Sequence, residues 1–137
     1  VGPGGARGAM ALDGIPVACK SFAFDAGIDV AQRLDANAAN GVAGAEVTGR
    51  NMAMTIEVEH GSLVVYDSQA KLKAATTTRV GVQVGSITGS RIVVAAEAAQ
   101  LTGNGDGDAE GVKTESLAFS CRSVTDAGDD EVYIAFT

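Results

Sequence analysis

The sequence is poor in aromatic side chains: its 137 residues include no Trp, two Tyr and four Phe. The apolar fraction of 46% is ordinary and comes mostly from Ala and Val. A chain of this length buries most of its apolar surface around one core. Small side chains predict that this core is thin and packed between sheets. The shortage of rings also disfavours a carbohydrate-binding module, which displays exposed aromatic side chains for stacking.

Cysteine and histidine are also scarce, because Cys19, Cys121 and His60 are the only ones in the chain. Two thiols in a chain of this length do not form a disulfide framework, so both are predicted to be reduced, small hydrophobic residues. A zinc site needs more ligands of these types. Residue type alone leaves a Cys–His nucleophile pair open. However, His60 ends a predicted strand beside Gly61, where a solvated turn is usual, and no catalytic residue is expected.

Positive charge is limited, since 10 Lys and Arg stand against 17 Asp and Glu, a formal net charge of −7. Proteins that hold phosphate backbones use clustered Lys and Arg, so adhesive binding of nucleic acid is not expected. The phosphate-binding motifs GxGxxG and GxxxxGK[ST] do not occur. No apolar run reaches the roughly 18 residues of a membrane-spanning helix, and no membrane insertion is expected.

What the sequence does contain is alternation of apolar and polar residues. In NMAMTIEVEH (51–60), the side chains of Met52, Met54, Ile56 and Val58 fall on one side of a strand. The same period recurs in segments separated by turn residues, namely 17–25, 79–85, 90–96, 112–122 and 130–137. In the last segment, Val132, Ile134 and Phe136 are the predicted inward residues. The pattern predicts a mainly β fold, an antiparallel sandwich or barrel.

One segment has the features of a helix instead. In VVYDSQAKLKAA (64–75), Asp67 or Ser68 is a plausible N-cap and the following residues have good helix propensity. Lys71 and Lys73 lie toward the end, where the helix dipole favours cations. Val65, Leu72 and Ala75 would share one face. The sequence therefore predicts one short α-helix against a β-rich body.

The first fourteen residues, VGPGGARGAMALDG, are rich in glycine and have almost no bulky side chain. Such a segment offsets little of the entropy lost on ordering. Residues 1–14 are therefore predicted to be a flexible arm or linker, and residues 15–137 a single domain.

The segment GNGDGDAEG (103–111) places acidic and amide side chains at alternate positions, as in a calcium loop. An EF-hand loop needs Gly at its sixth position, a bidentate Glu at its twelfth and helices on either side. Counted from Asn104, the sixth position is Ala109 and the twelfth is Glu115, and predicted strands flank the loop. The segment is predicted to be a solvated loop between strands, without a metal ion.

Short motifs connect the predicted strands from about residue 22 to residue 137. Thr48-Gly49-Arg50 leads into the Met/Ile/Val strand. The others are Gly85, Gly89-Ser90-Arg91, Ala98-Ala99-Gln100, the loop from Gly105 and Asp106 to Gly111, and Gly128-Asp129-Asp130. Together these residues resemble the tail tube, or major tail, proteins of long-tailed bacteriophages.

The resemblance implies two packed antiparallel sheets with a flanking helix, and rings of six stacked into a hollow tube. It implies a structural virion protein of the phage tail, assembled in the cytoplasm of the host bacterium, without enzyme activity or cofactor. Its partners would be further copies of itself, a tape-measure protein and the tail-tip and terminator proteins. DNA would pass through without adhering, and Glu57, Glu59 and Glu115 are candidates for an acidic lumen.

Two alternatives stay open at this point. Tubes of contractile secretion machines share the fold, so the wider machine is not determined. The other is a monomeric β-sandwich that serves as a binding or decoration module on a virion or cell surface. On the tube interpretation, deletion of residues 1–13 is expected to weaken ring stacking and to leave the fold intact.

Overall fold

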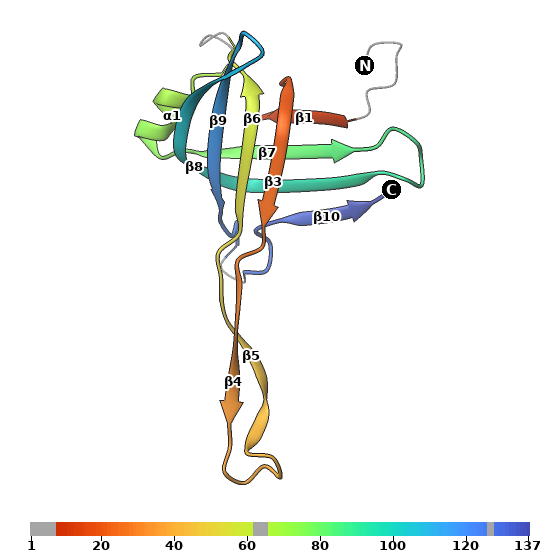
Figure 1. Cartoon of the computed structure of the whole chain (residues 1–137), viewed down its shortest axis with the longest axis vertical. Coiled ribbons are helices and arrows are strands. Elements are labelled where there is room, and N and C mark those ends of the chain that lie inside the picture. Colours follow the sequence, from red (N-terminus) through yellow and green to blue (C-terminus); the bar gives the residue numbers. More distant parts are fainter. Residues whose placement is uncertain (1–7, 62–65, 126–127) are drawn as a thin grey trace.

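The computed structural model describes residues 8–61, 66–125 and 128–137, and nearly all of its regular structure is antiparallel strand (Figure 1). The elements are β1 (Gly8–Leu12), β2 (Ile15–Pro16), β3 (Cys19–Asp25), β4 (Ile28–Leu34), β5 (Val42–Arg50), β6 (Ala53–Glu59), α1 (Ser68–Ala74), β7 (Thr77–Val84), β8 (Ile92–Ala109), β9 (Val112–Cys121) and β10 (Tyr133–Phe136). The predicted mainly β class with one short flanking helix is confirmed.

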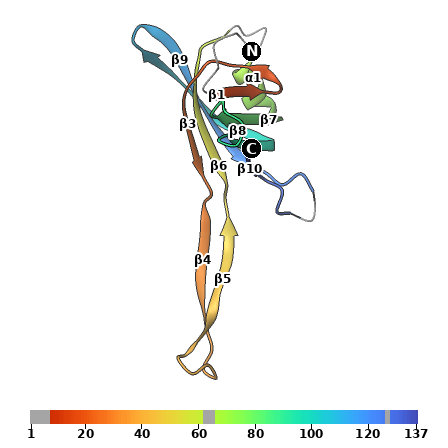
Figure 2. The ribbon, with the colours of Figure 1, turned by 90° about the vertical axis from the view of Figure 1, so that its right-hand side faces the viewer.

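The long strand β8 joins two layers of one sheet. The strand order is β2-β1-β7-β8-β9-β6-β3, and β10 pairs with the free side of β8. The first half of β8 pairs with β7 and β10, whereas its second half pairs with β9. Register shifts after Thr78 and Leu101 interrupt the ladders between these halves, and such bulges bend a sheet. The first layer, β1, β7, β8 and β10, therefore lies across the second, β3, β6 and β9 (Figures 1 and 2).

The core lies between the two layers and uses the predicted alternation. Met54, Ile56 and Val58 of β6 are buried, and Met52 packs against them. The other fully buried apolar side chains come from both layers and include Leu12, Val80, Ala96, Ala99, Leu101, Leu117 and Phe119. The two buried alanines of β8 take up little space, and Phe119 is the largest side chain that is fully buried.

The N-terminal segment belongs to this core from residue 8 onward. Met10 and Leu12 of β1 face Val82 and Val80 of β7, and Leu12 is completely buried. The prediction of a flexible arm is therefore wrong for residues 8–14, because the glycine content conceals the alternation of Met10 and Leu12. Residues 1–7 lie outside the described part. Deletion through residue 13 would remove a core strand, so such a deletion would not leave the fold intact.

The helix forms where the sequence predicts it. The Asp67 carboxylate caps α1 by accepting a hydrogen bond from the backbone N–H of Ala70 at 2.9 Å. The helix ends at Ala75, whose φ of 52° is left-handed, with Lys71 and Lys73 in the last turn. Leu72 packs against the core, whereas the predicted contribution of Val65 lies outside the described residues.

The acidic segment 103–111 is a strand for most of its length, so the predicted loop is wrong in extent. Strand β8 continues to Ala109, and only Glu110 and Gly111 turn the chain, both with positive φ. Such two-residue turns match the twist of the paired strands. Glycine at 107 permits close pairing, because a Cβ there would lie 2.8 Å from Thr114 Oγ1.

Candidate functional site: assembly surfaces

A two-stranded hairpin projects from the body of the molecule (Figures 1 and 2). We call residues 28–50, which comprise β4, β5 and their connection, the arm. Within the described chain, β4 and β5 pair only with each other, and every residue of β4 is exposed. A lone two-stranded hairpin is at best marginally stable in water. The arm therefore gains little stability from the rest of the described chain.

The arm has one apolar face and one polar face. Val30 pairs with Val47 and Leu34 with Val42 across the two strands, so their side chains share a face with Ile28. Leu34 is 79% exposed, and Ile28, Val30 and Val47 are each more than half exposed. On the other face, Arg33 Nε lies 3.7 Å from Glu46 Oε2. This gathering of exposed apolar side chains makes the face a candidate interaction surface.

The root of the arm is fixed to the body by backbone and charge. Gly27 has a φ of 51°, and its carbonyl accepts a hydrogen bond from the Asn51 N–H at 3.0 Å. Arg50 pairs with Asp129 and approaches Glu131 at 3.8 Å. The structure thus brings together the motif residues Arg50 and Asp129, which are far apart in the sequence.

Asp130 lies between Asp129 and Glu131, the two acidic residues near Arg50, and it fixes the conformation of the loop before β10. Its carboxylate accepts hydrogen bonds from the Ser123 hydroxyl and from the backbone N–H groups of Val124 and Thr125. The bonds from Ser123 and Thr125 lower the pKa of Asp130 to about 2. This motif residue therefore acts as a loop cap.

A second apolar surface lies at one end of the first layer, and we call it the apolar end. Ile92 of β8 pairs with Val84 on one side and with Phe136 of β10 on the other. These three side chains and Ile134 are between 42% and 77% exposed. The predicted burial of Ile134 and Phe136 is wrong, because the second layer does not extend over this end (Figure 1). Val132 does pack against the core.

The outer surface of the second layer, here called the acidic face, carries Glu57 and Glu59. Thr114 Oγ1 donates to Glu57 Oε1 at 3.0 Å and Ser21 Oγ donates to Glu57 Oε2 at 3.3 Å. Glu59 is exposed and lies 3.6 Å from Lys20. The neighbouring outward residues on β3, β6 and β9 are small: Ala23, Ala53, Thr55, Ser116, Ala118 and Ser120. Asp25 is exposed and pairs with Ala53, so it lies on this side too, and the charges of the face are Asp25, Glu57 and Glu59 together with Lys20.

Glu115 does not belong to this face. It is 9% exposed, and its carboxylate accepts hydrogen bonds from the Ser68 hydroxyl and from Asn104 Nδ2, the latter at 3.1 Å. Its place in the strand alternation is with the buried Leu117 and Phe119. The candidacy of Glu115 for a lumen surface is therefore corrected: its carboxylate joins α1 to the β8–β9 hairpin.

The remaining motif residues are dispersed over the fold. Gly89 has a φ of 85° in the turn between β7 and β8, and Gly111 completes the β8–β9 turn. Arg91 exchanges two backbone hydrogen bonds of 2.9 Å with Thr137. Gly49 lies within β5, and Gly105 and Asp106 lie within β8, so these three are strand residues and not turn residues.

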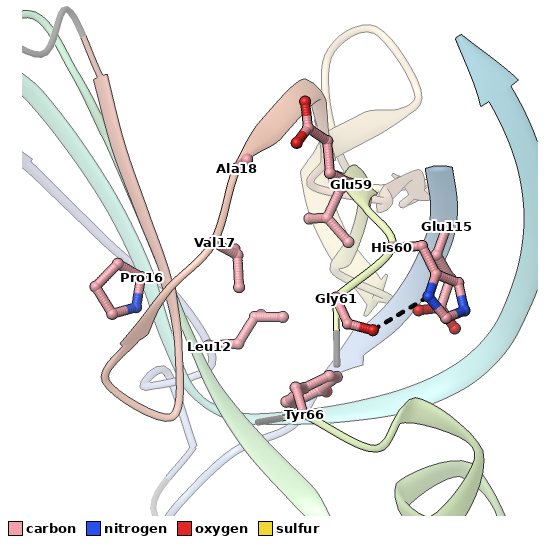
Figure 3. Close-up of a pocket in the computed structure, with 10 residues that line it drawn as sticks. Leu12, Pro16, Val17, Ala18, Glu59, His60, Gly61, Tyr66 and Glu115 are labelled. Atoms are coloured by element: carbon pink, nitrogen blue, oxygen red, sulfur yellow. Dashed lines mark hydrogen bonds between the residues drawn. The ribbon is translucent and has the colours of Figure 1, made fainter. Parts of the chain in front are cut away.

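A cavity of about 290 Å³ lies between the β1–β2 hairpin and the end of β6 (Figure 3). His60 stands at its rim, with Nδ1 3.1 Å from the Gly61 carbonyl oxygen. Glu115, also in the lining, is engaged by Ser68 and Asn104. Neither cysteine lines the cavity, and burial raises the pKa of the Cys121 thiol to about 11. The polar groups of the lining are engaged in structural contacts.

The described residues form neither a metal-binding cluster nor a membrane-spanning helix. Residues 8–61, 66–125 and 128–137 contain no group of three or more His, Cys, Asp or Glu placed to hold a metal ion. Over the same ranges, α1 is far too short to cross a bilayer, and no other helix qualifies.

The backbone is similar to chains of several solved structures. A chain of the sheath–tube complex of the PVC extracellular contractile injection system matches with a TM-score of 0.66 and 9% identity, over 96% of this chain and 89% of that one. A chain of the six-fold symmetrised anti-feeding prophage baseplate matches with 0.59 and 11%, over 94% and 91%. Hcp1 from Flavobacterium johnsoniae matches with 0.55 and 14%, over 96% and 97%. This chain has the tail tube fold.

The likeness concerns the fold and not the sequence. No protein-family model matches the chain, and no curated protein is similar to it. The tail tube fold is matched over nearly the whole length of the chain. With so few identical residues, the arm, the apolar end and the acidic face have to be interpreted from the chemistry of this chain.

Proposed function

We propose that this protein is a structural subunit that assembles with copies of itself into rings, and that the rings stack into the tube of a phage tail or a related injection particle. The observation that carries the proposal is the arm, whose apolar face is uncovered in the described chain. Burial of apolar surface is the main favourable term in association. A tail tube fold with such an arm is suited to self-assembly.

Rings of six are the proposed arrangement, supported by a neighbour that belongs to a six-fold symmetrised particle. A cyclic ring uses two different surfaces of each copy, one to donate and one to accept. The proposed partners are a tape-measure protein inside the tube and the tail-tip and terminator proteins at its ends. The proposed location is the virion tail, after assembly in the cytoplasm of the host bacterium.

The acidic face is the proposed lining of the tube. Most of its side chains are small, and Asp25, Glu57 and Glu59 give it negative charge. Like charge repels the phosphate backbone, and small residues offer no aromatic surface on which bases could stack. DNA would therefore move past this face without adhering.

The experiment is electron microscopy and light scattering of the purified protein at rising concentration, with and without calcium. Rings or tubes of uniform bore are expected, independent of calcium. A monomer at every concentration would contradict the proposal and favour the alternative, a binding or decoration module. Calcium-dependent assembly would contradict the structural interpretation of residues 103–111.

A matched pair of variants tests the role of the arm. Val30→Lys places a charge on the apolar face and is expected to abolish or greatly weaken assembly. Ala31→Lys places the same charge on the polar face, opposite Glu46, and is expected to assemble like the wild type. Circular dichroism should show a folded body in both. Equal assembly of the two variants would show that the apolar face of the arm is not used.

A further inference from the structure

We propose that the cavity between the β1–β2 hairpin and the end of β6 binds an aliphatic ammonium group, with the carboxylate of Glu115 as its counter-ion. Such a ligand has a short apolar stem and one terminal positive charge, which is the chemistry shared by a lysine side chain and a free alkylamine. The site lies within one subunit, so the inference goes beyond the proposed function and does not rest on it.

The walls of the cavity are mainly apolar. Its volume is about 290 Å³, and its apolar lining consists of Leu12, Pro16, Val17, Ala18 and Val58. In the view of Figure 3, Leu12 and Val17 lie on one side of the cavity. Sites for drug-sized ligands usually measure about 300–1,000 Å³, so this cavity suits a smaller group. An aliphatic stem that enters it removes apolar surface from water.

A buried carboxylate without a cation lies on the opposite side of the cavity (Figure 3). Glu115 is 9% exposed. Its Oε1 atom accepts both of the hydrogen bonds that described residues donate to this carboxylate, from Ser68 and Asn104. Both donors are neutral, and burial of a charge is costly unless the charge is paired. The Oε2 atom is therefore the acceptor that remains for a cation in the cavity.

The other charges near the cavity are already paired. Glu59, also in the lining, lies 3.6 Å from Lys20, and Lys71 of α1 pairs with Asp13. None of the ion pairs of the described residues involves Glu115. The described lining also contains no Lys or Arg. Glu115 is thus the carboxylate of this lining whose charge is not compensated, and a cationic ligand would compensate it.

The lining favours an organic cation over a metal ion. Calcium and magnesium take six or more oxygen ligands, and the described residues hold no group of three or more metal-binding side chains. An ammonium group has three donors and needs few acceptors. Its aliphatic stem can lie along apolar walls, as the stems of lysine side chains do on protein surfaces.

Isothermal titration calorimetry of the whole chain, at constant ionic strength, tests the site with three probes. Butylammonium chloride is expected to saturate one site per chain. Methylammonium lacks the stem and 1-butanol lacks the charge, so each should bind at least about tenfold more weakly. Equal binding of 1-butanol would overturn the role of the carboxylate. Equal binding of methylammonium would show only the attraction of cations to a chain of net charge −7, and would overturn the site.

Glu115→Gln tests the counter-ion, because the amide keeps an acceptor oxygen for Ser68 and Asn104 but removes the charge. Its affinity for butylammonium is expected to fall about tenfold or more, since a hydrogen bond to a charged group is lost. Glu97→Gln is the matched control: it removes the same charge from an exposed position on β8 and should bind like the wild type. Equal losses in the two variants would contradict the proposal.

Ala18→Leu tests the location and leaves every charge in place. It adds bulk at the lining of the cavity and is expected to abolish binding of butylammonium. Ala23→Leu makes the same substitution at an exposed position of β3 and should not affect binding. Circular dichroism checks that the variants are folded. Unchanged binding by a folded Ala18→Leu variant would overturn the site, even if Glu115→Gln failed to fold.

A fourth probe distinguishes the two sources of the ammonium group. N-acetyl-lysine N-methylamide carries the same stem and charge on a peptide backbone. If it binds as tightly as butylammonium, the site accepts a lysine side chain of a partner chain, whereas binding of butylammonium alone would assign the site to a free amine. Rings in electron microscopy without binding of either probe would overturn this inference and leave the proposed function standing. Binding by a chain that stays monomeric would do the reverse.

Discussion

At the scale of single residues, Asp13 connects three elements of the body. It lies in the turn between β1 and β2, where its carboxylate accepts the backbone N–H of Arg79 at 2.8 Å. It also pairs with Lys71 of α1, whose ammonium group lies 5.4 Å from the centre of the Tyr66 ring. The N-terminal hairpin, the helix and the start of β7 are therefore held at one point.

Replacement of this carboxylate should destabilise the fold. Asp13→Ala is expected to lower the free energy of unfolding by about 1 kcal/mol, since it removes a hydrogen bond to a backbone donor and a partly buried ion pair. Urea unfolding monitored by circular dichroism measures this. Asp106→Ala is the control: it removes an exposed pair with Lys113, at 3.6 Å, and should change little.

The contribution of Asp13 should also depend on pH. Burial raises the pKa of this carboxyl, but the hydrogen bonds from Lys71 and Arg79 and their charges together hold it below its ordinary value. The folded state then binds the proton less readily than the unfolded state, so the contribution is present above about pH 4 and is lost as the pH falls through the folded pKa. A difference between wild type and Asp13→Ala that grows in acid would contradict this.

Glu115 should behave as a structural residue and not as a surface carboxylate. Glu115→Ala leaves the buried Ser68 hydroxyl and Asn104 amide without their acceptor, so a loss of about 2 kcal/mol in unfolding free energy is expected. Glu59→Ala, on the acidic face, should cost far less. Thermal unfolding of the two variants measures this difference in stability. If both substitutions had equally small effects, Glu115 would not be the structural residue described above.

At the scale of elements, the direction of the arm depends on Gly27. A Cβ at this position would lie 2.3 Å from the Asn51 carbonyl oxygen, and the φ of 51° is itself unfavourable for other residues. Gly27→Ala is therefore expected to displace the root of the arm, to raise hydrogen exchange along residues 28–50 and to weaken assembly. Gly41→Ala is the matched control, because its φ of 69° is strained but nothing lies within 4 Å. Equal effects of the two would assign the loss to backbone strain alone.

The elements also show what local sequence can and cannot predict. Alternation in β6 predicts its buried side because Met54, Ile56 and Val58 pack within their own chain. The arm is not predicted: Ile28, Val30 and Leu34 alternate too, but Gln32 interrupts their run and no body surface lies against them. Alternation shows which residues share a face, but it does not show whether anything covers that face. The exposure of Phe136 could not be predicted for the same reason.

In the candidate site, too, the sequence predicts the positions of some residues and not of others. Glu57 and Glu59 lie on the outward side that the alternation of β6 predicts. Glu115 occupies an inward position of β9, and only contacts with Ser68 and Asn104, distant in sequence, make burial of its carboxylate tolerable. A buried carboxylate with such partners cannot be distinguished from an exposed one without the fold.

At the scale of the whole molecule, the position of the negative charge can be tested apart from its amount. In the tube, the acidic face is the proposed lining, so Glu59→Lys should place a cation in the lumen and also leave Lys20 without its partner. Glu97→Lys makes the same change of net charge in the part of β8 that belongs to the first layer. The two variants have equal net charge and differ only in location.

Assembled tubes of the wild type and of Glu97→Lys are expected to retain little short double-stranded DNA, whereas tubes of Glu59→Lys should retain more at low salt. Clustered positive charge binds phosphates, and salt weakens that binding steeply, so the difference should disappear as the salt concentration rises. Cosedimentation of labelled DNA with tubes measures it, and electron microscopy must show intact tubes in each sample. Greater retention by Glu97→Lys would place the first layer, and not the acidic face, against the lumen.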